Sequence, residues 1–199
     1  MNRRFFPPLA LEVLLQPETA LEKALLSVPE FRKGLLWGEP RFGHPEGMVA
    51  LHIREVLDNI SLIPRLSTLD RSCLRLIALA HDAFKYAEDR SRPRDLEKHH
   101  GKLARRFMEV YTSDSVVLDV LETHDDAYYC WLYHHRNPTP RPLKPLLDKI
   151  SYCLQLYYLF FKCDTQTGDK TQAPLRWFEQ EVAGIEVVQL KPYWPWERE

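Results

Sequence analysis

The sequence is poor in glycine, with 7 glycines against 15 prolines in 199 residues. So few glycines disfavour a small β-barrel with many tight turns. No GxGxxG or GxxxxGK[ST] segment is present, which disfavours the nucleotide-binding folds that depend on those loops. The formal net charge is only −1, so the chain has no global field to gather nucleic acid or anionic lipid.

Long apolar runs and paired cysteines are also missing. The run 156–161 is far shorter than the ~20 residues that span a bilayer. Pro7, Pro8 and Glu12 interrupt the apolar N-terminal stretch, and no signal-peptide cleavage site follows. The cysteines lack CxxC spacing, which suits buried free thiols and a cytoplasmic protein; they are Cys73, Cys130, Cys153 and Cys163.

What is present is an ordinary globular composition, 45% hydrophobic and 28% charged. Apolar residues at helical spacing predict an all-α single domain, 1–199. Its core spans about 44–168, with N-terminal helices in 9–37 and a C-terminal helix plus extended tail in 173–199 packed on it. We expect helices over 48–63, 68–86, 95–111, 114–135, 146–164 and 174–183. The stretch 185–190 is either a strand or an extended cover over the core.

Polar residues lie on five of the predicted inner faces. They are His52, His81 with Asp82, the pair His99 and His100, His124, and Asp164. A single histidine on an apolar face is more often a hydrogen-bonded core residue than a metal ligand. Five such faces together would bury many ionisable groups, and a divalent cation is the natural compensation. Imidazole nitrogens and carboxylate oxygens suit zinc, manganese, iron, cobalt or nickel better than calcium.

The order of these residues resembles the HD superfamily of metal-dependent phosphohydrolases. The resemblance covers about 44–168 and rests on His52, on His81 and Asp82 in LIALAHDAFK, and on Asp164 in YYLFFKCDTQTGD. HPEGMVALH, residues 44–52, also looks like the entry to the HD domain of some bacterial tRNA nucleotidyltransferases. Two departures are Met48, where those often have Asp, and Phe84, where the family often has Gly. We expect Phe84 to narrow the mouth of the site.

The resemblance implies one metal ion bound by His52, His81, Asp82 and Asp164. It also implies a second metal ion in some members, for which His100 and His124 stand on the matching helices. Mn, Co, Ni, Fe, Zn and Mg are the candidate ions. His99 remains an alternative to His100, which is preferred because Leu103 and Ala104 then match an apolar and a small family position.

The chemistry expected follows from the metal ion, which activates water for attack on phosphorus. Lys85 lies four residues after His81 and can neutralise a phosphate oxygen from the same helix face, or it is a surface lysine. Asp125 is a candidate proton donor to the leaving group. The candidate substrate-binding arginines are Arg90, Arg92 and Arg94.

The leading hypothesis is a metal-dependent phosphohydrolase acting on a small phosphate ester, a nucleotide above all. The same residue order also resembles di-iron oxygenases of this scaffold, such as myo-inositol oxygenase. A non-catalytic metal-binding module that senses a nucleotide or binds a partner is the other alternative. We expect no membrane association and no nucleic-acid partner, and the sequence leaves homo-oligomerisation open.

Overall fold

The computed structural model describes residues 10–89, 91–93, 95–136 and 142–190. Within these ranges all regular secondary structure is helical, apart from one isolated β-bridge between Arg41 and His44. The all-α prediction is therefore confirmed.

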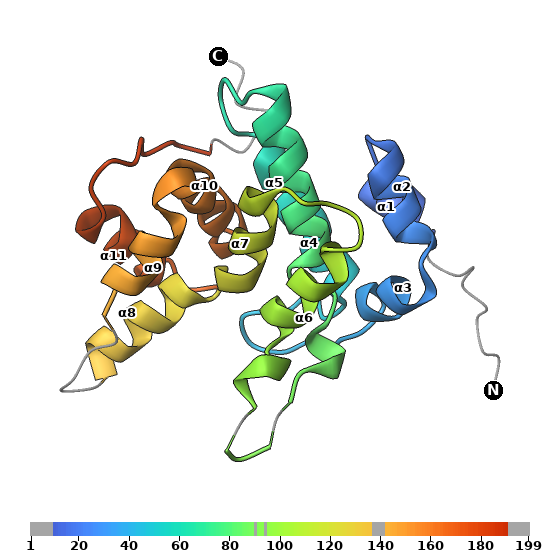
Figure 1. Cartoon of the computed structure of the whole chain (residues 1–199), viewed down its shortest axis with the longest axis horizontal. Coiled ribbons are helices and arrows are strands. Elements are labelled where there is room, and N and C mark those ends of the chain that lie inside the picture. Colours follow the sequence, from blue (N-terminus) through green and yellow to red (C-terminus); the bar gives the residue numbers. More distant parts are fainter. Residues whose placement is uncertain (1–9, 90, 94, 137–141, 191–199) are drawn as a thin grey trace.

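The helices follow one another in the order labelled in Figure 1. Their bounds are α1 (Leu11–Leu15), α2 (Ala20–Ser27), α3 (Pro29–Leu35), α4 (Val49–Ser61), α5 (Thr68–Ala80), η1 (Lys85–Ala87), η2 (Leu96–Lys98), α6 (His100–Met108), α7 (Ser115–Thr123), α8 (Asp126–Arg136), α9 (Lys144–Ile150), η3 (Ser151–Cys153), α10 (Leu154–Thr165) and α11 (Ala173–Glu181). The elements labelled η are short 3-10 helices.

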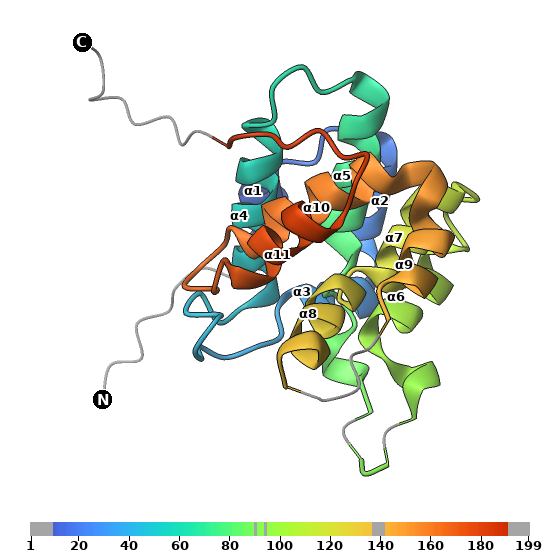
Figure 2. The same cartoon turned by 90° about the vertical axis from the view of Figure 1, so that its left-hand side faces the viewer.

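Helices α4, α5 and α10 pack against one another in the middle of the fold (Figure 1 and Figure 2). Helix α4 buries Val56 and Ile60 on one face, whereas α10 buries every residue of 156–163. Apolar residues at helical spacing make each of these faces hydrophobic, so burying them drives the three helices together. His52 is buried on the same face of α4, and the half-buried Asp164 lies near the C-terminal end of α10.

Two glycines permit close helix packing next to the polar residues. A Cβ on Gly34 of α3 would lie 1.6 Å from the carbonyl oxygen of Ala83, in the turn that follows α5. A Cβ on Gly101 of α6 would lie 2.8 Å from the carbonyl oxygen of Leu121 in α7. Only glycine lets the backbones approach this closely, so α3 and α7 sit directly against the segments that carry the candidate ligands.

The N-terminal helices are tied to the centre by a buried ion pair. Arg75 of α5 donates from Nη2 to Glu22 Oε2 of α2 at 2.8 Å, and both side chains are buried. Arg75 also donates to the carbonyl oxygen of Gln16 at 2.9 Å, at the end of α1. Pairing and hydrogen bonding together compensate the cost of burying this charge.

The predicted helix 68–86 is wrong at its C-terminal end. Helix α5 ends at Ala80, and residues 81–84 form a turn before η1. The predicted helix 95–111 is likewise divided, because His99 is extended and its Nδ1 accepts the N–H of Gly101 as the N-cap of α6. The apolar pattern alone does not reveal these breaks.

The predicted helix 114–135 is also two helices, α7 and α8, with His124 and Asp125 between them. Tyr157 of α10 accounts for the break. Its buried hydroxyl donates to the carbonyl oxygen of Thr123 at 2.9 Å and accepts the N–H of Ala127 at 3.2 Å. A tertiary contact thus pairs backbone groups that the break leaves without intrahelical partners. The predicted helix 146–164 is also divided, into α9, η3 and α10.

The C-terminal segment 185–190 is an extended cover and not a strand. Gln155 and Glu186 exchange two hydrogen bonds, of 3.0 and 2.8 Å, and the N–H of Val188 donates to the hydroxyl of Tyr158 at 3.3 Å. The remainder of the predicted tail, 191–199, lies outside the described residues. None of the helices described reaches the length and apolar character that crossing a membrane requires.

Candidate metal centre

Six side chains from five segments meet in the interior. His52 comes from α4, Asp164 from α10, and His100 is the first residue of α6. His81 and Asp82 come from the turn after α5, and His124 directly follows α7. Their ligand atoms form two groups, His52 with His81 and Asp164, and Asp82 with His100 and His124, each spanning no more than 4.8 Å. The structure therefore brings together all six predicted metal-ligating residues.

The first group, called here the first half of the centre, is the tighter one. His52 Nε2 lies 2.9 Å from Asp164 Oδ1 and 3.2 Å from His81 Nε2. His81 Nε2 lies 3.7 Å from the same carboxylate oxygen. Three donor atoms thus converge on one point between α4, α10 and the turn after α5, as the ligands of one cation do.

The second half of the centre is made by His100, His124 and Asp82. His100 Nε2 lies 3.1 Å from His124 Nε2, and Asp82 Oδ1 lies 3.5 and 3.8 Å from these two nitrogens. Both imidazoles are nearly fully buried. Their donor atoms face one another in a way that suits a second cation.

Asp82 joins the two halves. Its Oδ2 lies 3.5 Å from His81 Nε2 and 3.8 Å from His52 Nε2, while its Oδ1 faces His100 and His124. Oδ1 is buried and has no hydrogen-bond partner among the described residues. An unpaired buried carboxylate oxygen is costly, and a cation in the second half would compensate it. The residues therefore fit a bridged pair of metal ions.

Backbone carbonyl groups fix two of the histidine rings. His81 Nδ1 donates to the carbonyl oxygen of Ala78 at 2.9 Å, and His124 Nδ1 donates to that of Leu121 at 2.8 Å. In the neutral rings this leaves the lone pair on Nε2, which points into the centre. Burial lowers the pKa of His81 to about 3, so this ring is neutral near pH 7.

Two glutamates that the sequence analysis did not identify lie next to the Nδ1 atoms of His52 and His100. Glu46 Oε1 lies 3.4 Å from His52 Nδ1, and Glu88 Oε2 lies 3.6 Å from His100 Nδ1. Glu46 Oε1 also lies 3.0 Å from His44 Nδ1. Glu46 lies just before the N-terminus of α4 and His52 in its first turn, so the sequence could have predicted the contact between them. Glu88 follows η1, and no sequence pattern links it to His100.

The two carboxylates of the centre, Asp82 and Asp164, are ionised. Burial raises the pKa of Asp82, but His81 and Lys85 outweigh it and hold the pKa well below its ordinary value. Burial also raises the pKa of Asp164. The positive charge of Lys170 is the largest of the effects that outweigh burial and hold this pKa well below its ordinary value. Anionic carboxylates beside the neutral ring of His81 are in the protonation states in which such side chains bind metals. Burial lowers the pKa of His100, but Asp125 and Glu88 outweigh it and raise the pKa to about 9, so a cation in the second half would have to displace a proton from this ring.

The structure distinguishes His100 from His99. His100 is buried with Nε2 in the second half, whereas the Nδ1 of His99 caps α6. His99 Nε2 lies 3.7 Å from Asp125 Oδ2 and 3.9 Å from Glu88 Oε1, at the edge of the centre. The geometry therefore favours His100 as the ligand.

Asp125, predicted as a proton donor, lies beside the second half. Its Oδ2 is 3.3 Å from His100 Nε2 and its Oδ1 is 3.8 Å from His124 Nε2. Burial raises the pKa of Asp125, but His124 and His100 outweigh it, so the pKa lies well below its ordinary value. This position makes Asp125 a candidate seventh ligand, and its role as a proton donor stays a prediction.

Lys85 is close to the centre, but not in the way expected. It does not share a helix face with His81, because α5 has already ended and Lys85 begins η1. Its Nζ donates to Asp82 Oδ2 at 2.6 Å. Burial lowers the pKa of Lys85, but Asp82 and Asp125 outweigh it and raise the pKa above its ordinary value. The ammonium group is therefore charged at the edge of the centre.

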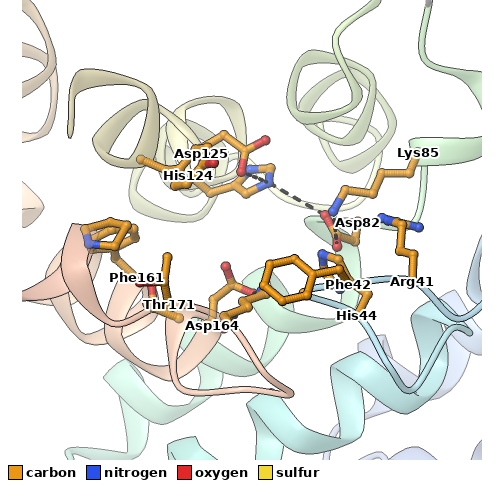
Figure 3. A pocket seen from close by; sticks show the side chains of 15 residues that line it. Arg41, Phe42, His44, Asp82, Lys85, His124, Asp125, Phe161, Asp164 and Thr171 are labelled. Carbon is orange, nitrogen blue, oxygen red and sulfur yellow. Dashed lines mark hydrogen bonds and ion pairs between the residues drawn. The ribbon is translucent and has the colours of Figure 1, made fainter. Parts of the chain in front are cut away.

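Of the predicted substrate-binding arginines, Arg90 and Arg94 lie outside the described residues. Arg92 is exposed and is not among the described residues that line the cavities over the centre. Two other cations line a cavity of about 350 Å³ there, Lys170 and Arg41, and Figure 3 labels the second of these. Lys170 donates from Nζ to Asp164 Oδ1 at 2.9 Å. Sequence reasoning missed both, because they lie in loops that only the fold brings to the centre.

Phe84 does not narrow the mouth of the site, contrary to the expectation. Its ring is buried, with its centroid 5.0 Å from that of Phe107 on α6 and 6.5 Å from that of Phe31 on α3. It therefore packs in the hydrophobic core behind the turn that carries Asp82.

No family model matches the chain, and searches of curated proteins and of solved structures likewise return no match.

Proposed function

We propose that this protein is a metal-dependent phosphohydrolase related to the HD superfamily, which hydrolyses a small phosphate ester with metal-activated water. The observation that carries the proposal is the position of Asp82. One of its carboxylate oxygens faces each half of the centre, and the oxygen in the second half is buried without a hydrogen-bond partner among the described residues. A carboxylate placed between two groups of donor atoms suits a two-metal hydrolytic centre, in which two ions stand close together.

The donor set favours a transition-metal ion. In the proposed centre each half combines two imidazole nitrogens with carboxylate oxygen, and no cysteine is part of it. Such ligands suit Mn, Fe, Co, Ni or Zn, and Mg remains a candidate through the carboxylates. When bound, the ions supply Lewis acidity and lower the pKa of coordinated water towards neutrality.

The remaining side chains of the cavity suit a phosphate group. Arg41, Lys85 and Lys170 bring three positive charges to the walls around the centre. Arg41 can bind two phosphate oxygens at once through its guanidinium, while the two lysines act as point charges. These cations orient the ester and offset the charge that develops on the oxygens of phosphorus.

The experiment is metal analysis of the purified protein, followed by hydrolysis assays on nucleoside monophosphates, nucleoside polyphosphates and simple phosphate esters with each metal added. His81→Ala and Asp82→Ala should lose bound metal and all hydrolysis, because both residues supply donor atoms. Full metal occupancy in both variants would contradict the site. Oxygen consumption by iron-loaded protein without phosphate release would favour the oxygenase alternative, and bound metal without turnover on any ester would favour the non-catalytic module.

A further inference from the structure

Lys170 places a positive charge on a carboxylate of the candidate centre. Its Nζ donates to Asp164 Oδ1 at 2.9 Å and to the backbone carbonyl oxygen of the same residue at 3.1 Å. His52 Nε2 also lies 2.9 Å from Asp164 Oδ1, which is the carboxylate oxygen of the first half of the centre. An ammonium group and the donor atoms of a cation site therefore meet at one oxygen.

The carboxylate oxygen of the second half has different surroundings. Asp82 Oδ1 faces two imidazoles and has no hydrogen-bond partner among the described residues. Asp164 Oδ1, in contrast, has a positive partner in Lys170, although its side chain is only 18% exposed. The charge of Lys170 thus offsets the burial of this carboxylate, as a bound cation does.

The loop that carries Lys170 is anchored by its backbone, while the lysine side chain has room to move. The N–H of Gly168 donates to Glu55 Oε2 of α4 at 2.8 Å, and Gln172 Nε2 donates to the carbonyl oxygen of Lys170 at 3.0 Å. The Lys170 side chain is 20% exposed and lines the cavity of about 350 Å³ in which Figure 3 shows Asp164. Its ammonium group can therefore leave the carboxylate by side-chain rotation alone.

We propose that Lys170 competes with the metal ion of the first half for Asp164 Oδ1 and so weakens the binding of this ion. A divalent ion on this oxygen stands close to the ammonium group, and the two positive charges repel each other. Glu46 has the opposite effect, because it brings a negative charge next to His52. The inference rests on the metal ions of the proposed function and does not depend on the hydrolytic reaction.

The test is calorimetric titration of the full, metal-free chain with Mn²⁺ alone, in wild type and in Lys170→Met. Methionine keeps most of the length of lysine but removes the charge. The variant should bind Mn²⁺ more tightly, on the order of tenfold, because even in water a unit charge changes the free energy of a divalent ion about 5 Å away by that order. The gain should disappear when His52, a donor of the first half, is also changed to alanine.

Lys144→Met is the matched control. Lys144 Nζ donates to Asp148 Oδ1 at 2.7 Å, so this variant also removes the lysine of a lysine–aspartate pair, on the exposed surface of α9. Its affinity for Mn²⁺ should equal that of the wild type.

Thermal scans give a second readout. Without metal, Lys170→Met should melt at a lower temperature than the wild type, because Asp164 has lost its ammonium partner. Saturating Mn²⁺ should raise the melting temperature of this variant more than that of the wild type, because the variant binds the ion more tightly.

Unchanged or weaker binding of Mn²⁺ by Lys170→Met overturns the competition, and weaker binding would make Lys170 a group that supports the ligand Asp164. An equal gain in Lys144→Met also overturns it, because the effect would then not depend on Asp164. Tighter binding by Lys170→Met without hydrolysis of any ester supports the competition and contradicts the phosphohydrolase. Absence of metal binding by wild type and variant contradicts both.

Discussion

At the scale of single residues, the four histidines of the centre have the same ring orientation. Each turns Nε2 inward. Nδ1 of His81 and of His124 donates to a backbone carbonyl group, whereas Nδ1 of His52 and of His100 lies 3.4 and 3.6 Å from a glutamate oxygen, and that of His100 has no hydrogen-bond partner among the described residues. An acceptor behind a metal-ligating imidazole fixes its ring and increases its basicity. The outer groups therefore belong to the centre even though they do not face a cation.

Glu46 is the outer group whose effect is simplest to measure. Glu46→Gln keeps the shape of the side chain but removes the negative charge beside His52 Nδ1. We expect metal affinity to fall about 10- to 100-fold, the usual effect of losing such a partner. Competition with a chelator measures this affinity. Glu39→Gln, in the same loop and exposed, is the control, and equal affinities for the two variants would contradict the role of Glu46.

His100 and His99 are adjacent but lie in different surroundings. His100→Ala should lower the metal content of the saturated protein by about one equivalent, because it removes a nitrogen from the second half. His99→Ala should leave the metal content unchanged, because its ring caps α6. Metal-to-protein ratios after saturation and desalting give the answer. A wild type that never exceeds one equivalent would show that the second half holds no ion.

At the scale of helices, backbone contacts determine where the ligands stand. Helix α3 touches the turn of His81 and Asp82 at Gly34, and α6 touches α7 at Gly101. Both contacts leave less room than a methyl group requires. The helix pairs therefore position the candidate ligands as well as forming the core.

Gly34→Ala tests the first contact. In an ordinary helix interior this change gains up to about 1 kcal/mol, because alanine has the higher helix propensity. Here the Cβ would lie 1.6 Å from the carbonyl oxygen of Ala83, so α3 must shift, at a cost of about 1–3 kcal/mol. Chemical denaturation measures the free energy of unfolding. We expect lower stability and weaker metal binding, and a stabilised variant would contradict the close contact.

Ion pairs also connect helix α6 to helix α7. Arg105 of α6 contacts Asp119 and Glu122 of α7, at 2.5 and 2.8 Å. Burial raises the pKa of both carboxyl groups, but hydrogen bonds outweigh it, so that both pKa values are lower than ordinary. The most important of these hydrogen bonds comes from Arg105 for Asp119 and from Lys149 for Glu122.

Carboxyl groups with a lowered pKa in the folded state stabilise the protein above their unfolded pKa values of 3.8 and 4.5. This contribution is lost as the pH falls through the folded values. Arg105→Gln should therefore cost about 1 kcal/mol at pH 7, since the groups are partly exposed, and less at pH 3. Denaturation curves at both pH values measure the difference. An equal cost at the two pH values would contradict it.

At the scale of the whole molecule, the candidate centre lies where the core helices meet, so binding of the proposed metal ions would be coupled to folding. An ion that binds only the folded chain stabilises it, by about 2.7 kcal/mol at a concentration 100 times its Kd. We expect Mn²⁺, Co²⁺ or Zn²⁺ to raise the melting temperature. The rise should vanish in Asp82→Ala, which lacks the bridge between the halves. Thermal scans with and without metal measure it, and an equal rise in the variant would place the binding elsewhere.

Much of the fold and of the centre is present in the sequence. Apolar spacing makes the chain helical and identifies inner faces, and a histidine or aspartate on each of five such faces points to one polar interior. Together with the family resemblance, this pattern selects His52, His81, Asp82, His124 and Asp164 from the sequence. It leaves His99 as an alternative to His100, and the structure distinguishes these two. The pattern can identify such residues because a polar side chain on a predicted apolar helix face needs a hydrogen-bond or charge partner in the interior.

Only the tertiary structure decided where helices break and which loops reach the centre. The break after α7 depends on Tyr157, which is 30 residues from Ala127 in the chain, and the end of α5 leaves Lys85 on a separate turn. Arg41 and Lys170 lie in loops without periodicity, so no pattern links them to the centre. Helical periodicity reports only contacts within one helix, whereas these residues are placed by contacts between segments far apart in the sequence.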